Sequence, residues 1–164
     1  MEYPPMRSYP LVRSTRLGGE TATSKIHVAS WQHFYRGHMP QDFLDSLDVD
    51  QRVNFWRQQL LALYTAADPE RAPPKSGIVV VVDESSTPQE AKGSATEKIL
   101  GFAMFGPSPH YDTEGQRRTG EVGAIYLQPG STGIGLGQLL MQAAITELAR
   151  LRYEEATLWV LDAN

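Results

Sequence analysis

The chain has 164 residues, a formal net charge of −4 and no cysteine, and 41% of its residues are hydrophobic. This length suits one domain that buries roughly two thirds of its unfolded surface. The absence of cysteine excludes disulfides, thiolate zinc sites and a cysteine nucleophile. The sequence has no cluster of basic residues, which argues against a nucleic-acid partner. No apolar run has the length of a signal-peptide core near the start or of a membrane-spanning helix anywhere, which predicts a cytoplasmic protein.

The hydrophobic periodicity predicts eight elements in the order β-α-α-β-β-β-α-β. In chain order they lie at residues 9–14, 21–35, 49–66, 78–82, 99–105, 121–127, 136–151 and 158–161. Residues 1–8 carry two prolines and no periodicity, so we expect a flexible lead before a single domain over 9–164. A turn over 40–47 is expected between the two N-terminal helices.

The two N-terminal helices also carry signals for their starts and buried faces. Asp48, with Gln51 three residues later, resembles a capping box, which predicts a helix start at Val49. The apolar stripe expected for that helix is Val53, Trp56, Leu60 and Leu63. The buried face expected for the helix over 21–35 is Ala22, Ile26, Ala29, Ser30 and His33.

The most informative stretch begins at residue 121 and runs to the end of the chain. Apolar residues on both faces of 121–127 predict a buried strand. Gly133, Gly135 and Gly137 follow it and precede a long amphipathic helix. Such glycines let the backbone turn tightly and leave N–H groups uncovered. Unpaired N–H groups at a helix start, together with the positive end of the helix dipole, predict an anion site, most often for phosphate.

Three classes of cofactor compete for a strand, a glycine turn and a helix. A nucleotide-triphosphate loop needs Lys followed by Ser or Thr at the helix start, where this chain has Gln138 and Leu139. A dinucleotide-binding fold agrees better, because the acidic Asp162 follows the next strand, but the third glycine of G-x-G-x-x-G is absent. The third class, coenzyme A, rests on a resemblance to a known family.

One long run is similar to the acetyl-coenzyme A signature of the GNAT family of N-acetyltransferases: IYLQPGSTGIGLGQLLMQAAITELARLRYEEATLWVLDAN. In that family Gln/Arg-x-x-Gly-x-Gly/Ala precedes the helix. Gly135 and Gly137 match the two small positions, and Thr132 stands where Gln or Arg is usual. Upstream, ASWQHFYRGHMPQDFLDSL resembles the SWxxxYRGxxPxxFL stretch of many bacterial members, and ILGFAMFGP resembles their third strand.

The resemblance implies an α/β fold of the α+β kind, with a mixed central sheet and helices on both of its faces. The family pattern continues with one more helix and two strands, so this chain is expected to lack the C-terminal part of the fold. That part commonly carries a Tyr thought to protonate the leaving thiolate. The strand over 158–161 should then expose an unpaired edge that includes Trp159 and Val160, and we expect self-association through it.

The resemblance implies direct transfer of acetyl from acetyl-coenzyme A to a primary amine of a small molecule or peptide. An alkyl amine of pKa about 10 must lose a proton at a cost of about 4 kcal/mol at pH 7, and Glu121 is the implied catalytic base. A backbone N–H near Leu127 would polarise the thioester carbonyl. The implied cofactor-binding residues are Ile125, Tyr126, Leu127, Thr132, Gly133, Ile134, Gly135, Leu136, Gly137, Gln138 and Asn164.

Two other readings stay open alongside the enzyme. The chain is alternatively a non-catalytic relative that binds coenzyme A or only oligomerises, or else a dinucleotide-binding module. A metal site is not expected, because the four histidines have no spacing that brings two of them onto one helix face.

Overall fold

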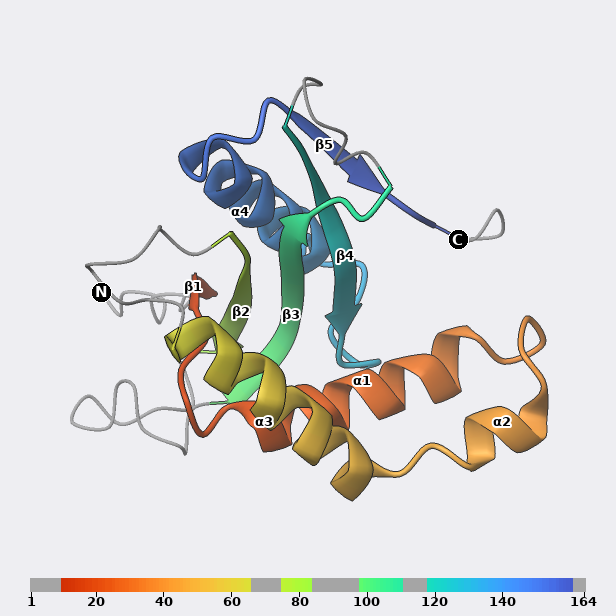
Figure 1. Cartoon of the computed structure of the whole chain (residues 1–164). Coiled ribbons are helices and arrows are strands. Elements are labelled where there is room, and N and C mark those ends of the chain that lie inside the picture. Colours follow the sequence, from red (N-terminus) through yellow and green to blue (C-terminus); the bar gives the residue numbers. More distant parts are fainter. Residues whose placement is uncertain (1–9, 66–74, 84–97, 111–117, 161–164) are drawn as a thin grey trace, which may run out of the picture.

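A computed structural model describes residues 10–65, 75–83, 98–110 and 118–160. Its elements follow the predicted order, with one short helix added (Figure 1). They are β1 (Leu11–Ser14), α1 (Glu20–Phe34), α2 (Gln41–Asp45), α3 (Val49–Thr65), β2 (Gly77–Asp83), β3 (Lys98–Pro107), β4 (Thr119–Leu127), α4 (Leu136–Arg150) and β5 (Glu155–Leu158). The expected flexible lead over 1–8 lies outside the described residues.

The strands form one mixed sheet in the order β1-β2-β3-β4-β5. The first four strands pair antiparallel, and β4 pairs parallel with β5. This last pair is parallel because α4 carries the chain back across the sheet between the two strands. A dinucleotide-binding module needs a mostly parallel, doubly wound sheet, which these described strands do not form.

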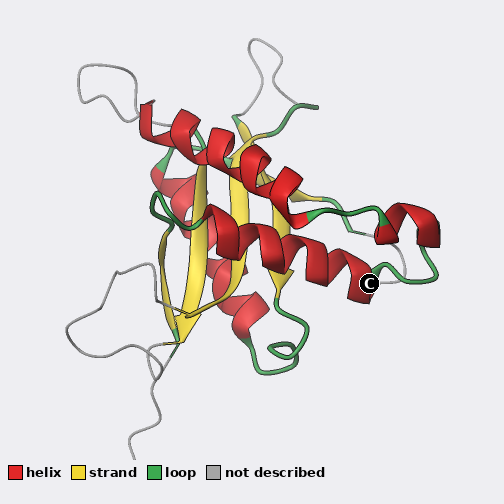
Figure 2. Cartoon of the chain, turned by 90° about the horizontal axis from the view of Figure 1, so that it is seen from below, coloured by secondary structure: helices red, strands yellow, loops and turns green. Residues whose placement is uncertain are grey.

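Helices cover both faces of the sheet, as the family resemblance implies. Figure 2 shows α1 and α3 in front of the strands and α4 behind them. Val79 and Val81 of β2 pack with α4, whereas Ile78, Val80 and Val82 pack with α1 and α3. Since both faces of β2 are covered, the strand reads as a continuous apolar run instead of alternating with polar residues. The predicted mixed α/β fold is therefore confirmed.

The last strand lies three residues earlier than predicted. β5 is Glu155–Leu158, in register with the start of β4 from the Thr119–Glu155 pair onward. The prediction followed the β-forming side chains of Trp159 and Val160, but these lie beyond the strand and are 68% and 64% exposed. Non-local pairing with β4 sets the position of β5, and it overrides local propensity here.

The helix signals were partly correct. The cap of α3 is confirmed, because the Gln51 N–H donates to Asp48 Oδ1 at 2.9 Å. The expected face of α1 was wrong at His33, which is exposed, while His27 and Val28 are buried. α1 packs against the sheet and against α3 at once, so its buried face is wider than a single stripe. The segment predicted as a turn contains α2, a helix too short for periodicity to detect.

Candidate functional site

The two C-terminal strands separate after a short paired segment. β5 pairs with β4 only from Thr119 to Val122, and Figure 1 shows the two arrows diverging beyond it. The register with β3 changes at the same point, because Phe105 faces Val122 and Met104 faces Ala124. Gly123 is therefore an extra residue in β4, that is, a β-bulge, and a bulge bends and twists the strand that contains it. The bulge directs the rest of β4 away from β5.

The diverging part of β4 presents backbone groups along its free edge. The Gln128 N–H donates to the Leu100 carbonyl of β3 at 2.8 Å. Because successive N–H groups of a strand point to opposite edges, those of Leu127 and Ile125 point to the open side instead. The N–H of Tyr126 points toward β3, so only its side chain can take part in the site. The site thus has two backbone donors along an edge that no described strand covers.

The glycine turn follows β4 directly and leads into α4. Gly133 and Gly135 have φ values of +76° and +88°, which side chains other than glycine rarely adopt. Gly135 is the N-cap of α4 and has no side-chain cap. Within the described residues, no backbone N–H from Thr132 to Gln138 donates a hydrogen bond. These amides remain available at the positive end of the helix dipole, which is what anion binding requires.

Other residues of the predicted cofactor set lie around this turn. The side chain of Leu136 is buried and anchors the helix start, whereas Ile134 is 70% exposed at the tip of the turn. Gly137 faces the side chain of Leu127 at the end of the open strand, so turn and strand edge form one continuous surface. Asn164 lies outside the described residues.

Glu121, the expected base, lies upstream of the bulge. β4 begins at Thr119, two residues before the predicted start, so Glu121 is inside the strand and not its first residue. The Ser108 hydroxyl donates to its Oε2 at 3.3 Å. The carboxylate lines a pocket of about 210 Å³ on the face of the sheet that α3 covers. A Cβ at Gly123 would lie 3.9 Å from its Oε1, so glycine leaves the carboxylate uncovered on that side.

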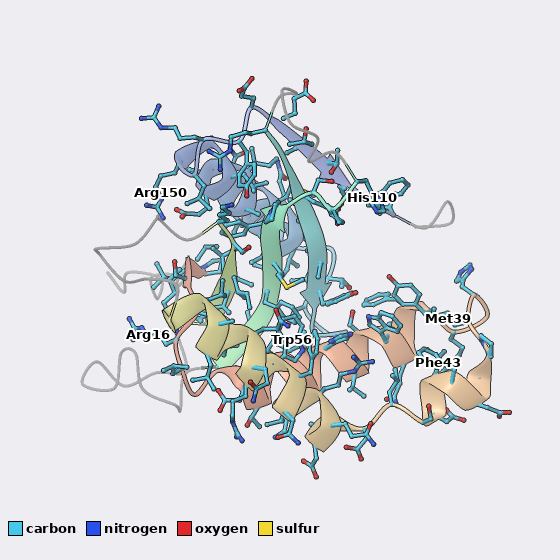
Figure 3. All side chains as sticks on the ribbon, in the orientation of Figure 1. Arg16, Met39, Phe43, Trp56, His110 and Arg150 are labelled. Atoms are coloured by element: carbon cyan, nitrogen blue, oxygen red, sulfur yellow. The ribbon has the colours of Figure 1, made fainter. Side chains whose placement is uncertain are left out.

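An aromatic cluster that the sequence predictions missed lies between α1 and β4. The His27 ring stacks on Tyr126, with centroids 5.0 Å apart and planes 15° apart. The Trp56 Nε1–H of α3 donates to His27 Nδ1 at 3.2 Å. Figure 3 labels Trp56 among the side chains of this part of the molecule. Trp31 packs edge-on against Tyr126, and it stacks on Tyr35. The signal was available in the sequence, since residues 27, 31 and 35 recur every four positions along one face of a helix.

Burial changes the ionisation of this cluster. His27 is 7% exposed, and burial, with a smaller effect of the Arg52 charge, lowers its pKa to about 4. Burial also raises the pKa of Tyr126. Both groups are therefore neutral near pH 7, and the proton of His27 lies on Nε2 because Nδ1 accepts from Trp56.

The buried His27 should make the fold less stable in mild acid. The unfolded histidine has a pKa of 6.5 and the folded one about 4, so the unfolded chain binds more protons between these values. This contribution is fully present above pH 6.5 and is lost as pH falls toward 4, about 3 kcal/mol in all. Urea unfolding at pH 7 and pH 4.5 should show the loss, whereas His27→Gln should show much less of it. Equal pH dependence in both proteins would contradict this assignment.

The described residues offer no metal centre and no membrane span. Among them, no group of three or more His, Asp or Glu side chains could hold a metal ion. No helix in the same ranges is long and apolar enough to cross a membrane.

Comparisons with known proteins agree with this site. The acetyltransferase (GNAT) family matches residues 31–164. The uncharacterized N-acetyltransferase YuaI of Bacillus subtilis (strain 168) is 28% identical over 153 residues, which are 93% of this chain and 72% of YuaI.

Two solved structures share the fold. PaiA N-acetyltransferase from Thermoplasma acidophilum, in complex with coenzyme A, has a TM-score of 0.66 at 16% identity, covering 95% of this chain and 82% of its own. YncA from Salmonella typhimurium, with its cofactor acetyl-CoA, has a TM-score of 0.61 at 19% identity. The match covers 96% of this chain and 73% of the YncA chain. The family match spans most of the chain and includes the open strand edge, the glycine turn and Glu121. The chain therefore belongs to the GNAT family of acetyltransferases.

Proposed function

We propose that this protein transfers an acetyl group from acetyl-coenzyme A to a primary amine by direct attack. The observation that carries the proposal is the open edge of β4 leading into a glycine turn whose amides donate to no described residue. Two proteins of the same fold contain coenzyme A or acetyl-CoA. The chain has no cysteine to carry an acyl group, which favours direct transfer over a cysteine acyl-enzyme.

Each part of the site has a role in this reaction. The amides of residues 132–138 hold the diphosphate, and the edge of β4 pairs with the pantetheine chain as a strand would. The N–H of Ile125 or Leu127 polarises the thioester carbonyl. The amine nitrogen attacks the carbonyl carbon, the C–S bond breaks, and coenzyme A leaves as its thiolate. Glu121 accepts the amine proton, directly or through a water molecule, and passes it to solvent.

A thermal-shift titration combined with a thiol-release assay tests the proposal. Acetyl-coenzyme A at a hundredfold excess over its Kd should stabilise the fold by about 2.7 kcal/mol. A panel of primary amines should then release free thiol. A shift without thiol release from any amine would favour the non-catalytic, coenzyme A-binding alternative. The absence of a shift would rule out both cofactor-binding functions.

Gly135→Ala should raise the KM for acetyl-coenzyme A about tenfold, because a side chain at this left-handed position costs about 1–2 kcal/mol and displaces the amides. The turnover number at saturating cofactor should change little. The matched control is Gly130→Ala in the same loop, where φ is not left-handed and no atom lies within 4 Å of an added Cβ. Steady-state kinetics of both variants check this prediction. If Gly135→Ala and Gly130→Ala had the same KM for acetyl-coenzyme A, that result would count against diphosphate binding at the turn.

Two further properties belong to this proposal. The outer edge of β5 has no partner among the described strands, and Leu158 to Val160 are exposed beside it, which supports self-association through this edge. Light scattering should detect a dimer, and a well-behaved monomer at high concentration would contradict it. We also propose a cytoplasmic location, where acetyl-coenzyme A is used, and fractionation of cells expressing the tagged protein tests it.

A further inference from the structure

Two buried N–H donors beside Tyr126 lack a hydrogen-bond partner among the residues that the structure describes. His27 is more than nine-tenths buried and carries its proton on Nε2, which has no partner in the described part of the chain. The indole Nε1 of Trp31 is likewise buried without one. It lies near enough to the Tyr126 hydroxyl to oppose the rise in that group's pKa, but the two do not meet hydrogen-bond geometry. Buried donors without an acceptor destabilise the fold, so their presence here calls for an explanation.

A positive charge also acts on the same two rings. Arg52 of α3 acts on both His27 and Tyr126, and its charge lowers the pKa of each. Within the described residues, its guanidinium has no carboxylate in ion-pair contact. The next arginine of that helix, Arg57, does have one, because its Nε lies 3.4 Å from Glu20 Oε1. The cluster therefore combines a cation and two N–H donors with no matching acceptor.

The cluster lies next to the reacting centre of the proposed enzyme. Tyr126 stands between the two residues whose N–H groups face the cofactor edge. Its side chain shares the α1 and α3 face of the sheet with Ala124, and Glu121 lies upstream on the same face. Trp31 extends the wall outward, because it packs against Phe43 of α2, which is partly exposed. An amine that attacks a thioester held at the edge of β4 beside Tyr126 would thus lie near aromatic side chains with donors among them.

We propose that this cluster selects an acceptor whose amino group is accompanied by a carboxylate and an apolar or aromatic side chain, as in a hydrophobic amino acid. The inference rests on the proposed acetyl transfer and names its substrate class. A carboxylate supplies the acceptor oxygens that His27 and Trp31 lack, and it carries the charge that complements Arg52. A diamine would instead bring a second cation to Arg52, which disfavours it. The aromatic walls bury the side chain of the substrate.

A series of matched acceptors tests whether the enzyme recognises a carboxylate on its amine substrate. Phenylalanine, phenylalaninamide and 2-phenylethylamine share a ring and an amine but differ in the group on the α-carbon, and leucine, leucinamide and isopentylamine repeat the series. With rates referred to the concentration of neutral amine, kcat/KM should fall at least tenfold when the carboxylate is lost. Equal or better use of the decarboxylated amines overturns the inference, while their thiol release still supports acetyl transfer.

Two variants and a control locate the effect. Arg52→Gln and Trp31→Phe should each raise the KM for phenylalanine at least tenfold, raise the KM for 2-phenylethylamine much less, and leave the KM for acetyl-coenzyme A unchanged. Arg57→Gln, on the same helix, should change none of these values. Calorimetry of phenylalanine and leucine added to the protein saturated with coenzyme A gives a readout independent of turnover. If neither binds although acetyl-coenzyme A stabilises the fold, the inference fails and cofactor binding stands; binding equally weakened by Arg57→Gln would also overturn it.

Discussion

Glu121→Gln should lower kcat about 100- to 10,000-fold, the range in which a positioned base contributes to catalysis. The amine must lose a proton that costs about 4 kcal/mol to remove at pH 7, and the amide of Gln cannot accept it. Gln keeps the size of the side chain and can still accept the hydrogen bond from Ser108. The KM for acetyl-coenzyme A should therefore stay within a few fold of its original value.

The pH profile of this variant separates a base from a structural role. As pH approaches the pKa of the amine, the substrate arrives already neutral and the variant should recover toward the rate of the original enzyme. The matched control is Glu154→Gln, which removes an exposed carboxylate just before β5. A Glu121 variant with full activity at pH 7, or with a loss that does not recover at high pH, would exclude this residue as the base.

Trp56→Ala should destabilise the fold by about 3–5 kcal/mol, the usual cost of removing a large aromatic side chain from a core. Trp56 is 2% exposed and packs edge-on against Phe102, with ring centroids 4.9 Å apart. Its loss leaves a cavity and also deprives His27 Nδ1 of its donor. Two-state urea unfolding measures the difference.

The neighbouring residue gives a control of similar chemistry. Phe55 precedes Trp56 in α3 but is 42% exposed, so Phe55→Ala should cost less than about 1 kcal/mol. The loss of stability in Trp56→Phe should lie between those of the two alanine variants, because phenylalanine retains most of the packing but loses the hydrogen bond to His27. Equal effects of the two alanine variants would show that Trp56 does not hold α3 against the sheet.

Local chemistry made the glycine turn predictable from the sequence. The left-handed φ of Gly135 and the missing cap of α4 depend on residues within one turn of chain, so composition alone indicates them. The buried hydrogen bond of His27 and the position of β5 were not predictable in this way. Each depends on a partner distant in the sequence, Trp56 for the histidine and the start of β4 for the strand.

The divergence of β4 from β5 could be predicted from the sequence only in part. A glycine inside a strand is a recognised sign of a bulge, and Gly123 stands between the apolar residues Val122 and Ala124 of β4. The sequence therefore held the signal, although only the register with β3 shows that the bulge falls where pairing with β5 ends.

That single extra residue also decides which way Glu121 faces. Val122 packs against α4 and Ala124 against the opposite face, although residues two apart in a regular strand point the same way. If Gly123 paired as a regular strand residue instead of forming a bulge, the two-residue alternation would be restored and the preceding segment would be rotated by half a turn. Val122 would exchange places with the carboxylate, which would then enter the apolar layer beneath α4. Deleting Gly123 would instead leave Val122 and Glu121 on their present faces and remove only the bend, so it separates the divergence of β4 from the direction of the carboxylate.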